Sequence, residues 1–115
     1  SESFEHYFQK LRKKYENVDF DYFQSNIEGE LINELQRAGT KMDGIILNPA
    51  GYSHTSVAIG DAIAAIKVPV IEVHISNIDA REEFRKLSHV SAKCKGTISG
   101  LGLKGYALAV EYFLK

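Results

Sequence analysis

The chain contains very little cysteine, which excludes several classes of protein. It contains one cysteine, Cys94, among 115 residues, so no disulfide can form within the chain. No CxxC pair or Cys/His cluster has the spacing of a tetrahedral zinc site. This cysteine usage predicts a reducing, cytoplasmic setting and no bound metal.

Long apolar runs and an excess of one charge are also missing. Runs such as IIL at 45–47 and AIAAI at 62–66 are far shorter than the roughly 18 residues that cross a bilayer. Fourteen Lys and Arg against fifteen Asp and Glu give a net charge of −1, without the basic footprint of a nucleic-acid or anionic-membrane binder. The opening SESFEHYF is polar and acidic, unlike a signal peptide. The sequence therefore predicts a small-molecule or protein partner, and neither nucleic acid nor membrane.

What is present is an alternation of helical and strand patterns within residues 1–115, the length of a single domain. Apolar residues recur at helical spacing in four segments, which are 3–15, 27–38, 58–66 and 103–114. Short apolar or alternating runs predict four strands, at 18–23, 44–47, 70–73 and 97–99. Ser25 and Glu28 have capping-box spacing ahead of the second long helix, and Gly39 is expected to end it. Asp79 and Glu82 repeat that spacing ahead of a short helix.

Short apolar strands between helices predict an α/β fold, a parallel sheet with helices on both faces in a flavodoxin-like, three-layer arrangement. Ligands in such folds sit beyond the carboxyl ends of the strands. The first helix has no strand before it, which indicates that a part of the protein is absent from this chain.

Polar residues collect at these strand ends. Glu72 and His74 lie two positions apart, so they share one face of a strand, and the carboxylate can hold the imidazole in one tautomer and favour its protonated form. This would make His74 a proton donor. An equally good reading is a structural pair in which Glu72 and His74 only satisfy each other's hydrogen bonds.

Other polar residues near this edge have ordinary readings beside the functional ones. His54 lies where the third long helix begins, which suits an anionic or hydroxylated ligand but also a cap. Asp61 lies on the same stripe two turns further on, where a solvated surface carboxylate is the more usual reading. Arg85, after AREEF, could hold a carboxylate or diol, or form surface pairs.

The stretch GLGLKG at 100–105 matches GxGxxG, but the chain offers no later strand with an acidic residue, so we expect a tight turn and close helix packing instead of dinucleotide binding. No Ser-His-Asp order, nucleophile elbow or P-loop is present. Acid–base chemistry without a cofactor is the simplest catalytic reading. A non-catalytic domain that binds a small ligand or a protein is the alternative.

Three separated motifs resemble type II 3-dehydroquinate dehydratase: NPAGYSHTS from Asn48, IEVHISNIDAREEFR from Ile71 to Arg85, and GTISGLGLKGY from Gly96. The resemblance covers essentially the whole chain. It implies cofactor-independent anti elimination of water from 3-dehydroquinate in the shikimate pathway. It also implies the family's 2-1-3-4-5 strand order, and trimers assembled into a dodecamer.

The resemblance also implies roles for individual residues. His74 would donate the proton and Glu72 would orient it, while Asn48 would contact substrate and support the acid. The remaining residues of the implied pocket would bind substrate, with Asp61 reaching a neighbouring subunit's site: His54, Asp61, Ile75, Ser76 and Arg85.

The chain departs from the family at its start. Family members begin with a strand and an NGPNLNLLG-type segment, followed by a mobile loop that carries an arginine and the tyrosine base. This chain opens at the family's first helix, and none of its tyrosines matches the base. We therefore expect residues 1–115 to be a fragment of a domain of about 140 residues, since one strand and one lid loop would make up the difference.

Overall fold

The chain folds as an alternation of helices and short strands. The computed structural model describes residues 2–53, 56–77 and 89–115. Its elements are α1 (Phe4–Lys14), α2 (Glu28–Lys41), β1 (Ile45–Leu47), the 3₁₀ turn η1 (Ala50–Ser53), α3 (Val57–Ala65), β2 (Val70–His74), the 3₁₀ turn η4 (Ser91–Lys93), β3 (Gly96–Ser99) and α4 (Lys104–Leu114). The four long helices and the last three strands confirm the prediction, whereas the helix expected after Asp79 lies outside the described residues. No helix of the described ranges is long and apolar enough to cross a membrane.

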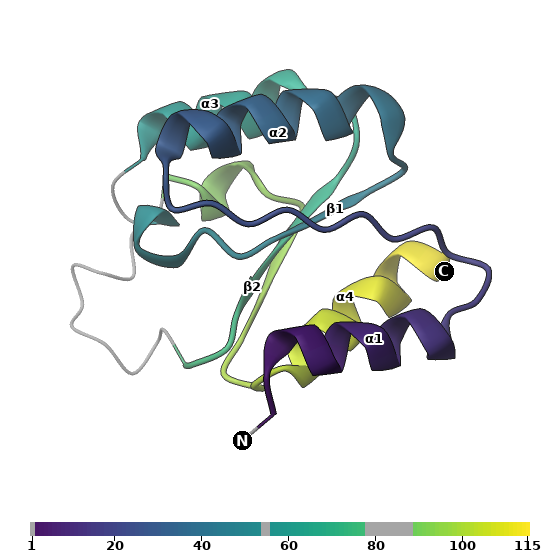
Figure 1. Cartoon of the computed structure of the whole chain (residues 1–115). Coiled ribbons are helices and arrows are strands. Elements are labelled where there is room, and N and C mark those ends of the chain that lie inside the picture. The colour runs from purple at the N-terminus through teal and green to yellow at the C-terminus, as the bar shows by residue number, and fades with distance from the viewer. Residues whose placement is uncertain (1, 54–55, 78–88) are drawn as a thin grey trace.

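The three strands form one parallel sheet in the order β1-β2-β3. Ile45 pairs with Val70 and Leu47 with Glu72, while Glu72 pairs on its other side with Thr97. The strands run the same way in Figure 1, so their carboxyl ends meet at one edge of the sheet. The predicted α/β class with a parallel sheet is confirmed.

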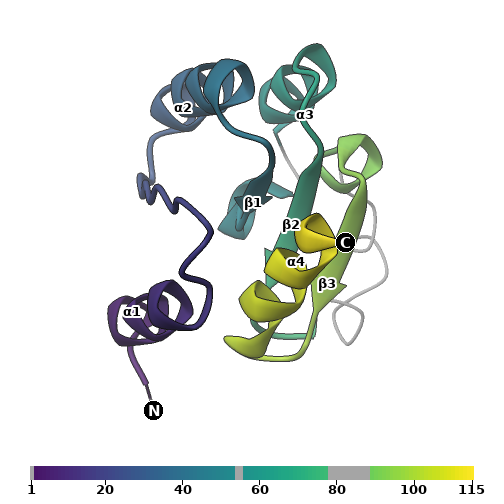
Figure 2. The same ribbon diagram turned by 90° about the vertical axis from the view of Figure 1, so that its right-hand side faces the viewer.

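Each face of the sheet is covered by a layer of helices (Figures 1 and 2). Because side chains alternate along a strand, Val70 packs with Ile59 and Ile63 of α3, on the side that α2 also covers. Ile71 and Val73 of the same strand pack on the opposite face with Ala109 of α4. The predicted three-layer arrangement is therefore confirmed, with one apolar core on each side of β2.

Residues 18–23, expected to be a strand, are extended but form no strand. Figure 2 shows this segment on the β1 side of the sheet and apart from it. A strand exists only when a neighbour pairs with its backbone, and no described strand pairs with this segment. The expectation was wrong here because alternation predicts an extended chain but not its partner.

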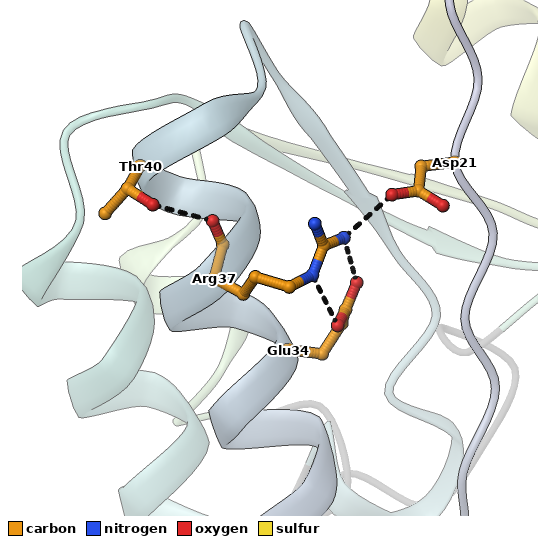
Figure 3. Close-up of polar contacts among 4 residues, drawn as sticks. All are labelled: Asp21, Glu34, Arg37 and Thr40. Carbon is orange, nitrogen blue, oxygen red and sulfur yellow. Dashed lines mark hydrogen bonds and ion pairs between the residues drawn. The ribbon is translucent and has the colours of Figure 1, made fainter.

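Side chains hold this extended segment in place instead. The guanidinium Nη2 of Arg37 donates to Asp21 at 2.8 Å and to Glu34 at 2.5 Å, which ties the segment to α2 (Figure 3). The hydrogen bond to Glu34, and to a smaller extent the one to Asp21, raises the pKa of Arg37. Between this segment and α2, the hydroxyl of Tyr52 donates to the carbonyl of Asn26 at 2.9 Å.

Two details of α2 differ from expectation. Ser25 and Glu28 form no capping box, because the Ser25 hydroxyl accepts from the Ile27 N–H at 3.0 Å and Glu28 accepts from Ser56 at 2.5 Å. The helix also continues past Gly39 to Lys41. Gly39 serves packing, since a Cβ there would lie 2.6 Å from Cγ2 of Ile66, just after α3.

The glycines of GLGLKG act as the sequence predicts. Gly100 and Gly102 have φ of 83° and 61°, a left-handed conformation that residues with a Cβ rarely adopt. Gly105 lets α4 approach the sheet, since a Cβ there would lie 3.1 Å from Cγ1 of Val73. The tight turn and the close helix packing are confirmed.

Gly60 controls the contact between α3 and the chain that leads into η4. A Cβ at Gly60 would lie 2.7 Å from the backbone carbonyl oxygen of His89, which cannot rotate away as a flexible side chain would. Val90, the next residue, is fully buried in the core on this side. Gly60 therefore allows the segment at 89–93 to lie directly on α3.

We expect Gly60→Ala to lower the free energy of unfolding by about 1–3 kcal/mol, the usual cost of overpacking. Gly29→Ala is the matched control, because Gly29 lies in α2 and a Cβ there would have nothing within 4 Å. Alanine at this position should raise the free energy of unfolding by about 0.5–1 kcal/mol. Urea denaturation followed by circular dichroism measures both. Equal stability of the two variants would show that the close approach at Gly60 costs nothing to fill.

Candidate functional site

The polar residues of the predicted site lie at the carboxyl ends of β1 and β2. Glu72 and His74 belong to β2 and are 0% and 5% exposed, unusual for two ionisable side chains. Asn48 directly follows β1, whose last residue, Leu47, pairs with Glu72. The parallel sheet thus brings these residues to the edge where α/β folds bind ligands.

Glu72 and His74 form the predicted pair. Both lie on the face of β2 that carries Val70, and Nε2 of His74 is hydrogen-bonded to Oε2 of Glu72. Because a carboxylate only accepts hydrogen bonds, Nε2 carries the hydrogen in this pair. This bond fixes the ring orientation and leaves Nδ1 as the nitrogen that Glu72 does not engage. The pair can therefore present one defined imidazole nitrogen to a ligand.

The second oxygen of Glu72 is also hydrogen-bonded. The hydroxyl of Ser91, in η4, donates to Oε1, and the Thr97 hydroxyl lies 3.4 Å from the same atom. A buried carboxylate needs such donors, because its burial without hydrogen bonds is costly. Sequence reasoning missed both residues. Thr97 could have been found from its strand register with Glu72, whereas no sequence pattern marked Ser91.

Asn48 points toward a residue that the sequence did not single out. Its Nδ2 donates to the hydroxyl of Tyr106 at 3.0 Å, and its Oδ1 accepts from the N–H of Ala50 at 3.1 Å. Tyr106 packs on the α4 face of the sheet, opposite to the face of Glu72 and His74. Within the described part of the chain, no hydrogen bond joins Asn48 to His74. Burial raises the pKa of Tyr106, and the bond from Asn48 offsets part of that effect.

The remaining predicted site residues are only partly described. Ile75 is 45% exposed, and its carbonyl accepts from the Gly102 N–H at 3.0 Å, which ties the end of β2 to the glycine turn. Ser76 and Asp61 are exposed, the first beyond β2 and the second on α3. His54 and Arg85 lie outside the described residues.

The chemistry available at this edge is proton transfer. Across residues 2–53, 56–77 and 89–115, no three His, Cys, Asp or Glu side chains gather closely enough to hold a metal ion. Cys94 is half-buried, and its burial, with a smaller effect of the Glu72 charge, raises the pKa of its thiol to about 12. The thiol therefore stays protonated near neutral pH, which leaves the imidazole of His74 as the group suited to move a proton.

The raised pKa of Cys94 predicts slow alkylation. Because iodoacetamide reacts with the thiolate, the rate at pH 9 should be at least about tenfold lower in the folded chain than in urea. The alkylation rate should rise steeply between about pH 8 and 10 only in the unfolded chain, whose thiol has an ordinary pKa. Glu72→Gln should modestly speed alkylation of the folded chain, because it removes a charge that raises the pKa of Cys94. Cys94 is the only cysteine, so mass spectrometry reads its modification directly. Equal rates in the folded and unfolded chains would contradict the burial of this thiol.

Comparisons with known proteins show the family of the chain. The family model described as "Dehydroquinase class II" matches residues 1–114. The 3-dehydroquinate dehydratase of Fusobacterium nucleatum is 56% identical over 103 residues, which are 89% of this chain and 70% of that protein. The 3-dehydroquinate dehydratase of Campylobacter jejuni strain 81-176 is 55% identical over 101 residues, or 88% of this chain, and the match spans 64% of its length.

Solved structures give the same result. The crystal structure of type II dehydroquinase from Butyrivibrio crossotus superposes with a TM-score of 0.92 at 41% identity, covering 99% of this chain and 81% of that one. The type II dehydroquinase from Propionibacterium acnes gives a TM-score of 0.83 at 42% identity, covering 90% and 73% of the two chains. With a family model matched over nearly its whole length, this chain belongs to the class II dehydroquinases, the type II 3-dehydroquinate dehydratase family.

Proposed function

We propose that the chain forms the proton-donating and substrate-binding part of a type II 3-dehydroquinate dehydratase. The reaction is anti elimination of water from 3-dehydroquinate to give 3-dehydroshikimate, in the shikimate pathway that leads to chorismate and the aromatic amino acids. One observation carries the proposal. A buried carboxylate–imidazole pair lies at the carboxyl end of β2, in a chain 56% identical to a 3-dehydroquinate dehydratase.

In the proposed reaction His74 is the general acid. A base removes the proton next to the ketone, an enolate forms, and its electrons return to expel the hydroxyl group, which leaves as water with the proton of His74. Since Glu72 engages Nε2 of the ring, the proton is transferred from Nδ1. Glu72 thus acts through His74, by holding the ring in one orientation.

The other proposed residues hold the substrate. The backbone amides of Ile75 and Ser76 would bind its carboxylate, and Asn48 would contact it from the end of the neighbouring strand. The exposure of Ile75 and of Ser76 beyond the end of β2 supports this role. His54 and Arg85 would hold ring hydroxyls.

Asp61 has a proposed role between subunits. It is exposed on α3, which is consistent with a reach toward the site of a neighbouring copy. The proposed assembly is a trimer, with four trimers in a dodecamer. The enzyme would act in the cytoplasm without a cofactor.

We further propose that the sheet accepts one more parallel strand beside β1, which would bring the lid and the base. Two features of the chain support this. The described sheet ends at β1, and residues 18–23 run extended on that side without a pairing strand. The chain also spans 70% and 64% of the lengths of the two relatives described above. Under this proposal residues 1–115 are part of a domain of about 140 residues, the difference being one strand and one lid loop.

The function is tested with the chain joined to the N-terminal strand and lid of a type II dehydratase. We expect dehydration of 3-dehydroquinate, followed by the ultraviolet absorbance of the conjugated product. His74→Ala should lower kcat by about 10²–10⁴-fold, the usual contribution of a general acid. His6→Ala is the matched control, since His6 is exposed on α1. Near-wild-type turnover in His74→Ala would remove His74 from the role of acid.

The added strand makes a separate prediction about the backbone. In the joined protein, the amides of residues 19–23 should exchange with solvent at least about tenfold more slowly than in the chain alone, because they gain strand hydrogen bonds. Amides in the middle of α4 serve as the control and should change little. Unchanged exchange at residues 19–23 would show that no strand pairs there.

The turnover assay of the joined protein also distinguishes the dehydratase from the alternative function. A non-catalytic binding domain would bind the substrate or another small ligand in calorimetry and yet give no dehydration in the joined protein.

A further inference from the structure

We propose that Ser91 is a positioning residue: its hydroxyl anchors the carboxylate of Glu72, and through Glu72 it fixes the imidazole of His74. The inference deepens the proposed function and rests on it for its catalytic meaning. The positioning itself is a property of the folded chain and can be measured without substrate.

The two oxygens of the Glu72 carboxylate have different close partners. Ser91 donates to Oε1 and His74 donates to Oε2. The two oxygens belong to one rigid plane, so a donor that fixes Oε1 also sets the direction of Oε2. The last torsion of a glutamate side chain has only a broad, shallow preference, so without the Ser91 bond the plane can rotate and the ring can follow it.

Free energy also favours this anchor. Glu72 is 0% exposed, and a carboxylate that is removed from water loses the hydrogen bonds of its hydration shell. Hydrogen bonds donated by the protein offset part of that loss. His74 engages only Oε2, and the Thr97 hydroxyl lies 3.4 Å from Oε1, so the hydroxyl of Ser91 is the close donor that keeps the carboxylate in place.

The fold holds Ser91 firmly. Val90, the preceding residue, is 0% exposed and packs into the core with Ile59 of α3. The carbonyl of Ser91 accepts from the Cys94 N–H at 3.2 Å, which closes the η4 turn. Gly60, which has no Cβ, lets the His89 carbonyl and the same segment lie directly on α3. A rigid support of this kind is what a positioning residue requires.

Thr97 provides the matched comparison. Its hydroxyl is directed at the same Oε1 atom, but at 3.4 Å the contact is too long to contribute as much as an ordinary hydrogen bond. Loss of the Thr97 hydroxyl should therefore matter much less than loss of the Ser91 hydroxyl.

The test measures solvent exchange of the Nε2–H proton of His74 in the full chain. The chain has four histidines, and ¹⁵N-histidine labelling resolves them, with the His74 signal assigned by its absence in His74→Gln. In Ser91→Ala we expect this proton to exchange at least about tenfold faster than in the wild type, the change that loss of a hydrogen bond worth about 1.4 kcal/mol gives. Ser91→Thr keeps a hydroxyl and should restore slow exchange, and Thr97→Val should change the rate by less than about threefold.

Backbone exchange distinguishes positioning from lost stability. If Ser91→Ala only destabilised the fold, the buried amide of Val73 would speed up by the same factor as the His74 proton. We expect the His74 proton alone to respond. Unchanged His74 exchange in Ser91→Ala, a parallel change at Val73, or an equal effect of Thr97→Val would overturn the proposal.

Turnover then tests the catalytic consequence. In the chain joined to the strand and lid, Ser91→Ala should lower kcat about tenfold or more with little change in KM, since the acid is misplaced while substrate contacts remain. Ser91→Thr should recover most of the rate. If the joined wild-type protein gave no turnover, the proposed function would fail, while the exchange result would still decide the role of Ser91.

Discussion

The burial of one carboxylate constrains much of this structure. Glu72 occupies the central strand of the described sheet and has no exposure to solvent, so its hydration must be replaced by donors from the protein. One close donor comes from its own strand, two residues on, and another comes from Ser91, 19 residues further along the chain in a different element, while the Thr97 hydroxyl lies further away at 3.4 Å. The positions of η4 and of the carboxyl end of β2 are therefore linked through a single side chain.

The alternation of a β-strand makes this compatible with a stable core. Val70, Glu72 and His74 share one face of β2, whereas Ile71 and Val73 pack on the other face against α4. The apolar residues of both faces bury the strand, and the polar pair lies only toward its carboxyl end. The same strand can thus carry structural residues and reactive ones without a conflict between them.

Sequence patterns predicted the elements whose signals are local. Helical periodicity indicated α1 to α4, and short apolar runs indicated β1 to β3, because these patterns depend on which face of an element is buried. The Glu72–His74 pair was also predictable, since the strand period places residues i and i+2 on one face. The failures have a different cause. Residues 18–23 alternate like a strand but have no pairing strand, and Gly39 could end a helix but instead makes room for Ile66.

The sequence by itself determined the α/β class, the family, and a carboxylate and an imidazole on the same face of a buried strand. Only the tertiary structure decided which groups complete that pair. Ser91 meets Glu72 because residues 89–93 lie against α3 and Val90 is buried in the core, and Tyr106 meets Asn48 because α4 covers the opposite face of the sheet. Such contacts join residues distant in the chain. Their distances depend on how the layers pack, which no local periodicity records.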